Sequence, residues 1–255
     1  MKTTDKDDRF LEGQIEDVIS MAEDRYMITH SSFLSPHERR IAENVVKRGV
    51  PQGITAMFSG GFQDAERTML ICIPEYLSIE EENPLVVISA KTREGAKELR
   101  HGDYLGSILG LGITRDKVGD ILVRAGGADI IVDRSIAHFL MLNYSKAGRM
   151  PLSLVEKGIE NLTIPEQQVE QRSDTVMSLR LDSLVAAGFR VSRGVAQDSI
   201  KKGLVFVDSV EETSVSKEVA QGQKITFRGK GRMVLTEIGG ETRKGRTFIE
   251  YDRYI

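Results

Sequence analysis

The stretch Leu179–Val207, LRLDSLVAAGFRVSRGVAQDSIKKGLVFV, predicts two short helices followed by a strand. Leu181, Leu184 and Val185 recur at spacings of three and four residues, which places them on one apolar face of the first helix. We expect Gly188 to end that helix in the left-handed conformation, because a residue without a Cβ adopts this conformation most easily.

The second helix is expected to begin after Ser192, since a serine at the N-cap accepts a backbone N–H of the first turn. Gly203 should stop this helix, and the Val-Phe-Val sequence of residues 205–207 then predicts a short strand. The inner face of the second helix is predicted to hold three apolar residues, Val195, Ala196 and Ile200.

The polar side of this helix pair is basic. Lys201 and Lys202 fall in the last helical turn, where the helix dipole favours a cation even without a ligand. Arg193 follows the capping serine, where the dipole disfavours a cation, so contact with RNA explains this residue better than a purely local role. A compact helix pair with cations on one side suits a phosphate backbone better than a small substrate. The five cations are Arg180, Arg190, Arg193, Lys201 and Lys202.

A second basic segment follows at residues 228–232, Arg-Gly-Lys-Gly-Arg, between predicted strands at 224–227 and 232–235. Backbone amides of such a glycine-rich turn can lie near phosphate. Another basic turn at 241–246 precedes a last predicted strand at 247–254. The predicted RNA-binding residues are Arg180, Arg190, Ser192, Arg193, Lys201, Lys202, Arg228, Lys230 and Arg232.

The pattern R-L-D, then S-R-x-x-A-x-x-x-I-x-x-G-x-V-x-V, resembles the S4 domain, an RNA-binding module. It falls here on residues 180–182 and 192–207. The family usually continues into an Asn-Gly turn, whereas this chain has Asp208-Ser209 followed by two glutamates. We therefore expect a longer turn at this position.

Charge is distributed unevenly over the 255 residues, whose formal net charge is −3. Residues 172–255 hold 15 Lys and Arg against 11 Asp and Glu, which leaves 20 against 27 upstream. The basic end thus coincides with the S4-like stretch, as an RNA-contacting module requires.

Composition limits the other function classes. No apolar run approaches the roughly 18 residues of a membrane helix, and the first residues lack the apolar core of a signal peptide. Cys72 is the only cysteine, so an internal disulfide or a cysteine-built zinc site is excluded. We expect a cytoplasmic protein without a membrane partner.

The chain upstream of the S4-like stretch predicts two further units, which makes the expected fold class α+β. Residues 1–78 should form a small α/β unit with a helix at 7–28, a second helix after Ser35, and strands at 54–58 and 68–73. Ser35, Pro36 and Glu38 have the spacing of a capping box with proline at the first helical position.

Residues 79–165 predict the order β-α-β-β-α-β, which is typical of ferredoxin-like domains and of RNA-recognition motifs. Strands are expected at 85–90, 119–124, 128–133 and 152–157, and helices at 102–110 and 136–146. The candidate central strands, LVVISA and GDILVRA, carry no aromatic residue. We therefore expect no base stacking on this sheet. The S4-like domain then occupies residues 173–255.

Two stretches upstream are similar to the YlmH family of bacterial S4-domain proteins. These are residues 101–113, HGDYLGSILGLGI, with the positions that follow to Ile121, and residues 58–67, FSGGFQDAER. The resemblance covers essentially the whole chain. It implies a ribosome-associated quality-control factor, whose S4 domain contacts the RNA of the large ribosomal subunit and the peptidyl-tRNA and supports rescue of stalled nascent chains.

We expect no catalytic residue, no cofactor, no metal and no small-molecule substrate. The four histidines have no ligand spacing, Gly60-Gly61 lacks the Lys-Ser/Thr of a phosphate-binding loop, and Gly110-Leu111-Gly112 lacks the rest of a dinucleotide fingerprint. The main rival is an RNA-modifying enzyme, a pseudouridine synthase or an rRNA methyltransferase, because S4 modules are also appended to such enzymes. A scaffold for division proteins is the third alternative.

Overall fold

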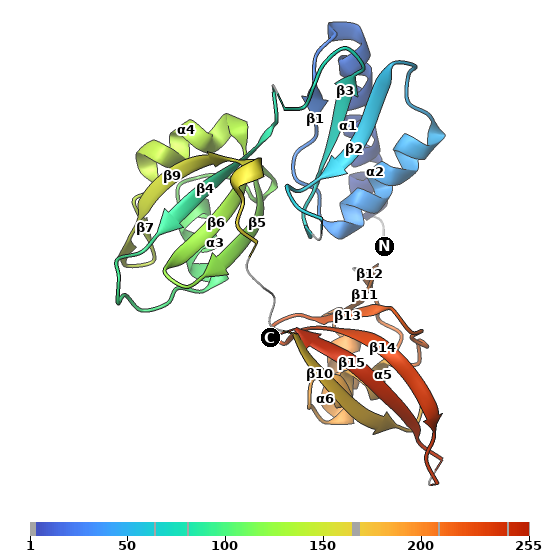
Figure 1. The fold of residues 1–255 in the computed structure, drawn as a ribbon. Helices are drawn as coiled ribbons and strands as arrows, with labels where there is room; N and C mark the ends of the chain where they lie inside the picture. Colours follow the sequence, from blue (N-terminus) through green and yellow to red (C-terminus); the bar gives the residue numbers. More distant parts are fainter. Residues whose placement is uncertain are drawn as a thin grey trace. The chain divides into compact units, whose positions relative to one another are not determined.

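The computed structural model describes residues 4–63, 65–80, 82–164, 169–208, 210–243 and 245–254. Contacts divide the chain into two compact units, residues 1–165 and residues 166–255 (Figure 1). Helices and antiparallel sheets occur in both, which confirms the α+β class. The expected boundary between residues 78 and 79 lies inside the first unit, so a separate unit at 1–78 stays a prediction.

Unit 1 begins with a helical layer on a small sheet. The sheet has the order β1-β3-β2 and is antiparallel throughout. Apolar residues from both helices and from β3 form one core, with Ile15, Ala42 and Leu70 fully buried. The elements are α1 (Thr4–Arg25), β1 (Thr29–His30), α2 (Pro36–Arg48), β2 (Ile54–Ser59) and β3 (Met69–Pro74).

The capping box predicted at Ser35 is confirmed. The Ser35 hydroxyl accepts the backbone N–H of Glu38 at 3.4 Å, and the Glu38 carboxylate accepts the backbone N–H of Ser35 at 2.6 Å. Pro36 is the first residue of α2, and Gly49 caps its C-terminal end. The sequence did not signal β1, which has only two residues.

The middle of the chain forms a four-stranded sheet of order β5-β6-β4-β9, in which every neighbouring pair is antiparallel. This is the β-α-β-β-α-β arrangement that the sequence predicts. The central strands are β4 and β6, so the expectation that residues 119–124 form a central strand is wrong: β5 is an edge strand. The elements are β4 (Leu85–Lys91), α3 (His101–Leu109), η1 (Arg115–Lys117), β5 (Val118–Arg124), β6 (Gly127–Asp133), α4 (Arg134–Asn143), the hairpin β7 (Lys146–Ala147) and β8 (Met150–Pro151), β9 (Ser153–Gly158) and η2 (Ile159–Asn161).

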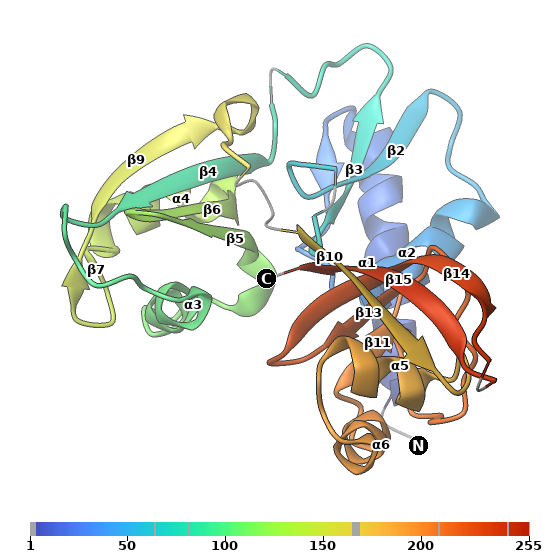
Figure 2. The same ribbon diagram turned by 60° about the horizontal axis from the view of Figure 1, so that its bottom comes forward.

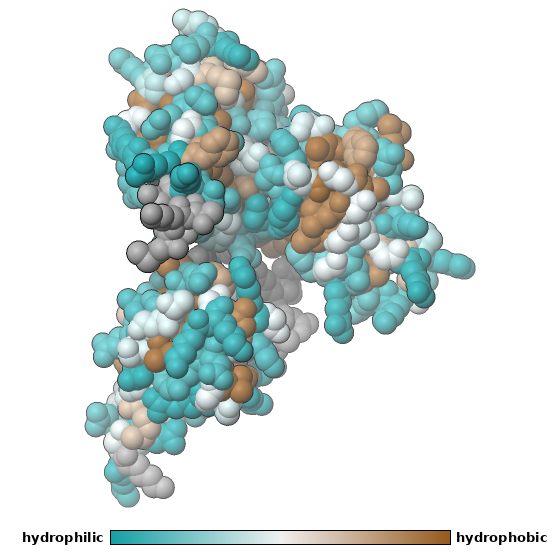
Figure 3. All heavy atoms as spheres, turned by 180° about the vertical axis from the view of Figure 1, so that it is seen from behind, coloured by the Kyte–Doolittle hydropathy of each residue, from teal (hydrophilic) through white to brown (hydrophobic). Residues whose placement is uncertain are grey.

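Both helices cover one face of this sheet, where Tyr104, Ile108 and Leu140 pack on strand residues such as Ile88 and Ile130. Their outer side exposes Leu109, Phe139 and Leu142 by 37%, 43% and 70%. Figure 3 shows apolar side chains gathered on this part of the surface. No helix within the described chain has the length and apolar character needed to cross a membrane.

The opposite face of the middle sheet is partly covered by residues of β3 and of the segment between β1 and α2. Leu85 and Ile131 point to this face and join a core with Phe33, Met69 and Ile71. Two glycines lie where the two halves of unit 1 pack so closely that a side chain would not fit. A Cβ on Gly119 would meet the Phe33 ring at 2.6 Å, and a Cβ on Gly61 would meet Ile159 at 2.4 Å. The two halves of unit 1 therefore share buried apolar surface.

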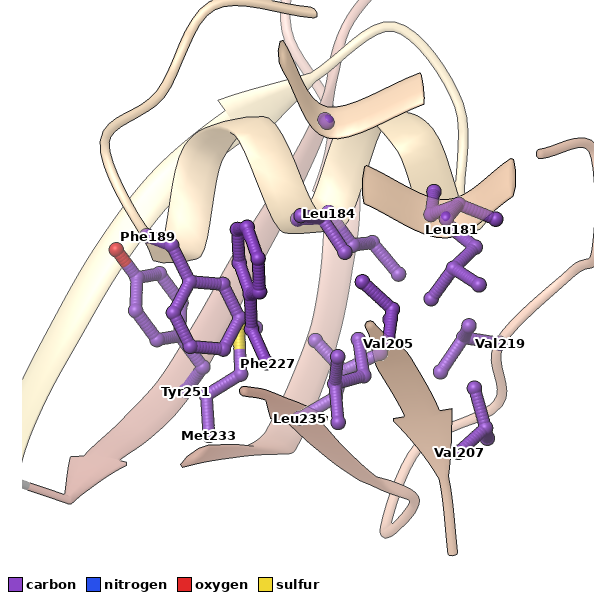
Figure 4. Close-up of a cluster of buried hydrophobic side chains, with 14 of the residues drawn as sticks. Leu181, Leu184, Phe189, Val205, Val207, Val219, Phe227, Met233, Leu235 and Tyr251 are labelled. Carbon is purple, nitrogen blue, oxygen red and sulfur yellow. The ribbon is translucent and has the colours of Figure 1, made fainter. Parts of the chain in front are cut away.

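Unit 2 is a helix pair packed on one face of a six-stranded antiparallel sheet of order β10-β15-β14-β13-β11-β12 (Figure 2). Side chains from both helices and from five strands meet in one core, which Figure 4 shows around Leu184, Phe227 and Leu235. The elements are β10 (Val169–Val176), α5 (Leu181–Gly188), α6 (Arg193–Lys201), β11 (Val205–Val207), β12 (Val210–Glu211), β13 (Lys224–Phe227), β14 (Gly231–Glu241) and β15 (Thr247–Tyr254).

The long pairing of β10 with β15 was not predicted. From its polar composition alone, the stretch 166–171 is expected to be a linker strand or turn leading into unit 2. In the structure its last three residues begin β10, where Val169 lies opposite Tyr254. Residues 166–168 of this stretch lie outside the described residues. Only Val176 of β10 is buried, so this edge strand lacks the alternation of apolar and polar residues that identifies a strand in a sequence.

The expected longer turn after β11 is wrong. Val207 pairs directly with Val210, which leaves only two residues between the strands. Asp208 takes a left-handed φ of +49°, which aspartate tolerates better than most residues. Its carboxylate accepts the Lys224 N–H at 2.9 Å and the Gln223 side-chain amide at 2.7 Å. Ser209, the second turn residue, lies outside the described residues.

Candidate nucleic-acid interface

The helix pair of unit 2 is built largely as its sequence predicts. Leu181, Leu184 and Val185 are completely buried. The Ser192 hydroxyl accepts the Val195 N–H at 3.2 Å and so caps α6. Gly203, with φ of +68°, follows the last turn of α6.

Two of the predicted details are wrong. Val195 is 48% exposed, because the buried face of α6 comprises Ala196, Ser199 and Ile200 instead. Gly188 does not adopt the left-handed conformation, which falls on Arg190 at φ +50°. The absence of a side chain at Gly188 serves packing: a Cβ there would lie 2.0 Å from the Met233 sulfur.

Asp182 joins the N-terminal ends of the two helices. Its Oδ1 accepts the Arg180 Nε–H at 3.2 Å, and its Oδ2 accepts the Arg193 Nε–H at 3.0 Å and the Gln197 side-chain amide at 2.8 Å. The Asp182 side chain is fully buried, whereas those of Arg180 and Arg193 are 37% and 53% exposed. Arg193 is therefore anchored through Nε, and Arg180 through Nε and, at 3.5 Å, through Nη2, while both side chains still reach solvent.

This anchoring changes the charge that the two arginines present. Burial raises the pKa of Asp182, but the hydrogen bonds from Gln197, Arg180 and Arg193 outweigh burial and hold that pKa at about 2. The carboxylate is thus ionised at neutral pH, and the group carries a net charge of +1 rather than +2. In return, an anchored guanidinium loses less side-chain entropy when it binds a phosphate.

Four of the remaining predicted cations, in two segments of the chain, lie near the C-terminal end of α6. Lys201 and Lys202 are exposed there, and the chain then passes to Leu204, whose carbonyl accepts the Arg228 N–H at 2.9 Å. The exposed side chains of Arg228 and Lys230 belong to the turn between β13 and β14. The structure therefore brings the end of α6 and the basic turn together.

Arg253 binds the backbone of the basic turn between β13 and β14. Its role was not predicted from the sequence. Its Nη1 donates to the carbonyls of Arg232 and Tyr254 at 2.8 and 2.6 Å, and its Nη2 donates to the carbonyl of Lys230. The same guanidinium lies 4.6 Å from the centroid of the Phe189 ring. Arg253 thus links the basic turn to the C-terminal end of α5.

The amides of this turn are less available than the sequence suggests. The Arg228 N–H donates to Leu204, and the Lys230 N–H donates to the Phe227 carbonyl at 2.9 Å. Contact with phosphate at this turn therefore rests on side chains rather than on an amide cradle.

Arg190 lies apart from the Asp182 group, at the other end of α5. It is exposed, and its charge, with those of Arg172 and Arg253, opposes the rise that burial produces in the pKa of Tyr251. Apart from Arg190, the predicted RNA-binding residues thus form two groups, one around Asp182 and one that comprises the end of α6 and the basic turn held by Arg253. Asp182 is the last residue of the R-L-D motif, but its role as an acceptor shared by both helices arises only from the packing of α5 against α6.

The middle sheet offers no stacking surface of the usual kind. Neither central strand, β4 nor β6, contains an aromatic residue. The face opposite the helices is partly covered by the core around Phe33, and Asp129 on that face is buried and paired with Arg124 at 2.9 Å. RNA contact by this part of the chain must therefore use other surfaces.

Comparisons with known proteins bear on both units. Residues 80–161 match the family model described as "Putative RNA-binding domain in YlmH". The "Ribosome-associated protein quality control protein P2" of Bacillus subtilis (strain 168) is 33% identical over 249 residues, which cover 97% of this chain and 96% of that protein. The structure "Cell division protein ylmH from Streptococcus pneumoniae" covers 62% of this chain and 95% of its own, at 26% identity and a TM-score of 0.49.

Proposed function

Since the chain belongs to the YlmH family, we propose that it binds RNA on the ribosome as a non-enzymatic quality-control factor. Its site would be the helix pair of unit 2, acting as an S4 domain. Its partners would be the RNA of the large subunit and the peptidyl-tRNA of a stalled complex. The Bacillus subtilis relative is named as ribosome-associated and as a quality-control protein, which supports this assignment.

The observation that carries the proposal is the paired anchoring of Arg180 and Arg193 on the buried Asp182. A buried ion pair on its own is weak evidence for stability. Here the two arginines keep 37% and 53% of their side chains exposed. This combination of fixed Nε and accessible guanidinium suits recognition of an RNA phosphate.

The proposal is tested by replacing Arg193 and Lys202 together with Ala. Association with purified large subunits carrying peptidyl-tRNA should weaken by at least tenfold, because two phosphate contacts are lost. Arg180 and Gln197 still donate to Asp182 in this variant, so the helix pair is expected to remain folded. Co-sedimentation measures the association.

The matched control replaces Arg40 and Lys47, two exposed cations on α2 of unit 1, with Ala. It removes the same charge, and alanine is a good helix former. If both double variants sediment with the subunit as well as the parent chain does, the helix pair has no part in binding.

Binding should also weaken steeply with salt, because RNA contacts by cations release counterions. For the Arg193→Ala, Lys202→Ala variant, the slope of log affinity against log salt should be smaller by about 2, roughly one for each lost phosphate contact. Titrations of the same large-subunit complex between 50 and about 300 mM salt measure both slopes. Equal slopes for the variant and the parent would argue against direct phosphate contacts by these two residues.

Two other experiments address the alternatives. An assay for modified nucleotides in rRNA and tRNA, with and without the protein, would reveal an RNA-modifying enzyme. Crosslinking in cells would distinguish an RNA-binding factor from a scaffold for division proteins, because only the former should yield covalently attached ribosomal RNA.

A further inference from the structure

The sheet of unit 2 has a second face, opposite the helix pair, on which aromatic and basic residues share one row. Phe206 on β11 lies opposite Thr226 on β13, Thr226 lies opposite Arg232 on β14, and Arg232 lies opposite Tyr254 on β15. Partners in neighbouring strands point to the same face of a sheet. The residues that alternate with this row, among them Val205, Phe227 and Met233, are buried under the helices. The row therefore lies on the outer face, the side of the sheet away from α5 and α6 in Figure 1.

An arginine guanidinium lies over each aromatic ring in this row. The Cζ of Arg228 lies 4.9 Å from the centroid of the Phe206 ring, and the Cζ of Arg232 lies 4.4 Å from the centroid of the Tyr254 ring. One such pair is common in proteins and by itself indicates little. Two such pairs in one row of a sheet face form a set of flat, cationic surfaces, and guanidinium planes and aromatic rings are the groups on which unpaired bases stack.

The charge on this face favours bases over phosphates as ligands. Glu211 on β12 lies opposite Phe206 in the same row. Glu250 and Asp252 lie on β15 at positions that share the face of Tyr254, at spacings of four and two residues. The face is therefore not uniformly basic, and neutralisation of a duplex backbone would be poor here. Stacking depends less on net charge and needs accessible planar groups. The Arg228 side chain is exposed, and those of Phe206, Arg232 and Tyr254 are half-buried.

The dimensions of the row also fit a short single strand. Phe206 and Tyr254 are separated by three strand spacings, which corresponds to roughly 14 Å. A four-stranded sheet of similar breadth holds two or three unpaired bases in RNA-recognition motifs. We propose that the outer face of the unit 2 sheet stacks two or three nucleotides of single-stranded RNA on Phe206, Arg228, Arg232 and Tyr254. The inference rests on the proposed function only in that RNA is the ligand class, since it uses a surface distinct from the helix pair.

The test uses the full chain and a single-stranded oligoribonucleotide that contains 2-aminopurine, whose emission falls when the base stacks. The double variant Phe206→Leu, Tyr254→Leu removes both rings while keeping apolar side chains. It should bind the oligonucleotide at least tenfold more weakly and lose most of the quenching. The control, Phe10→Leu with Tyr76→Leu, changes one Phe and one Tyr that are 69% and 60% exposed on unit 1, and it should behave as the parent chain does.

Further arms keep the result interpretable. Arg228→Gln removes one exposed guanidinium at little risk to the fold, and it should reduce quenching if the ring variant proves unstable. Arg193→Ala with Lys202→Ala should leave oligonucleotide quenching unchanged even if large-subunit association is lost. Conversely, intact large-subunit association by that helix-pair variant, together with lost quenching by the ring variant, would refute the proposed function and retain the stacking face. Absence of quenching in the parent chain, or equal quenching by Phe206→Leu, Tyr254→Leu and its control, would overturn the inference.

Discussion

Replacement of Asp182 by Asn is expected to lower the free energy of unfolding of unit 2 by about 2 kcal/mol at neutral pH, because hydrogen bonds to a charged acceptor are lost. The carboxylate accepts donors from Arg180, Arg193 and Gln197. An amide in its place has one oxygen and presents an NH₂ group toward donors. Hydrogen exchange of the α5 and α6 amides, followed by mass spectrometry, measures the loss.

The same carboxylate predicts a dependence on pH. Its pKa is about 2 in the folded chain against an ordinary value of 3.8. A lowered folded-state pKa contributes stability that is fully present above pH 4 and is lost as the pH falls toward 2. The Asn variant should therefore lack this part of the acid dependence.

The control for this prediction is Asp198→Asn. Asp198 is an exposed carboxylate on α6, and its replacement should change stability by less than about 0.5 kcal/mol. If Asp182→Asn is as stable as Asp198→Asn at pH 7, then Asp182 does not organise the helix pair.

A second large effect is expected from Gly60→Ala in unit 1. A Cβ at this position would lie 2.3 Å from the backbone oxygen of Arg67 and 2.4 Å from the Cβ of Ala65. Because a backbone atom cannot move aside as a side chain can, we expect a cost of about 3 kcal/mol. The melting temperature of unit 1 should fall by roughly 6–12 °C.

The effect should extend to the middle sheet. Asp120 on β5 accepts the backbone N–H groups of Glu66 and Arg67 at 2.7 and 3.2 Å, so displacement of this loop breaks a contact between the two halves of unit 1. Faster hydrogen exchange at Glu66 and Arg67 would report that break.

Gly13→Ala is the matched control, with an effect of opposite sign. Gly13 lies within α1, and a Cβ there would meet no atom within 4 Å. Alanine should stabilise this helix by about 0.5–1 kcal/mol. A melting temperature for Gly60→Ala equal to that of the parent chain would contradict the prediction, because it would show that the loop accommodates a Cβ at residue 60 without cost.

Local signals in the sequence predicted local structure well. Ser35, Pro36 and Glu38 gave the start of α2, because the capping box is complete within four residues. The β-α-β-β-α-β order followed from apolar runs such as Leu85–Lys91, which are buried along almost their whole length. Such features depend on neighbours in the chain, and the sequence contains them.

Features that depend on distant partners were missed or misassigned. Gly188 was interpreted as a helix terminator, but Met233, far along the chain, is the reason that no side chain fits there. Val195 has the apolar character of an inner residue, yet the rotation of α6 against α5 leaves it exposed. The acceptor role of Asp182 and the anchoring by Arg253 likewise arise only when helices and strands are brought together.

The pairing of β10 with β15 has a mechanical consequence. Because these strands are antiparallel and Val169 lies opposite Tyr254, the two ends of unit 2 emerge side by side. A pulling force applied through these ends would open the ladder like a zipper, breaking one or two hydrogen bonds at a time rather than shearing all of them together. We therefore expect unit 2 to yield at low force under optical tweezers, with rupture beginning at the Val169–Tyr254 pair and travelling toward Val176.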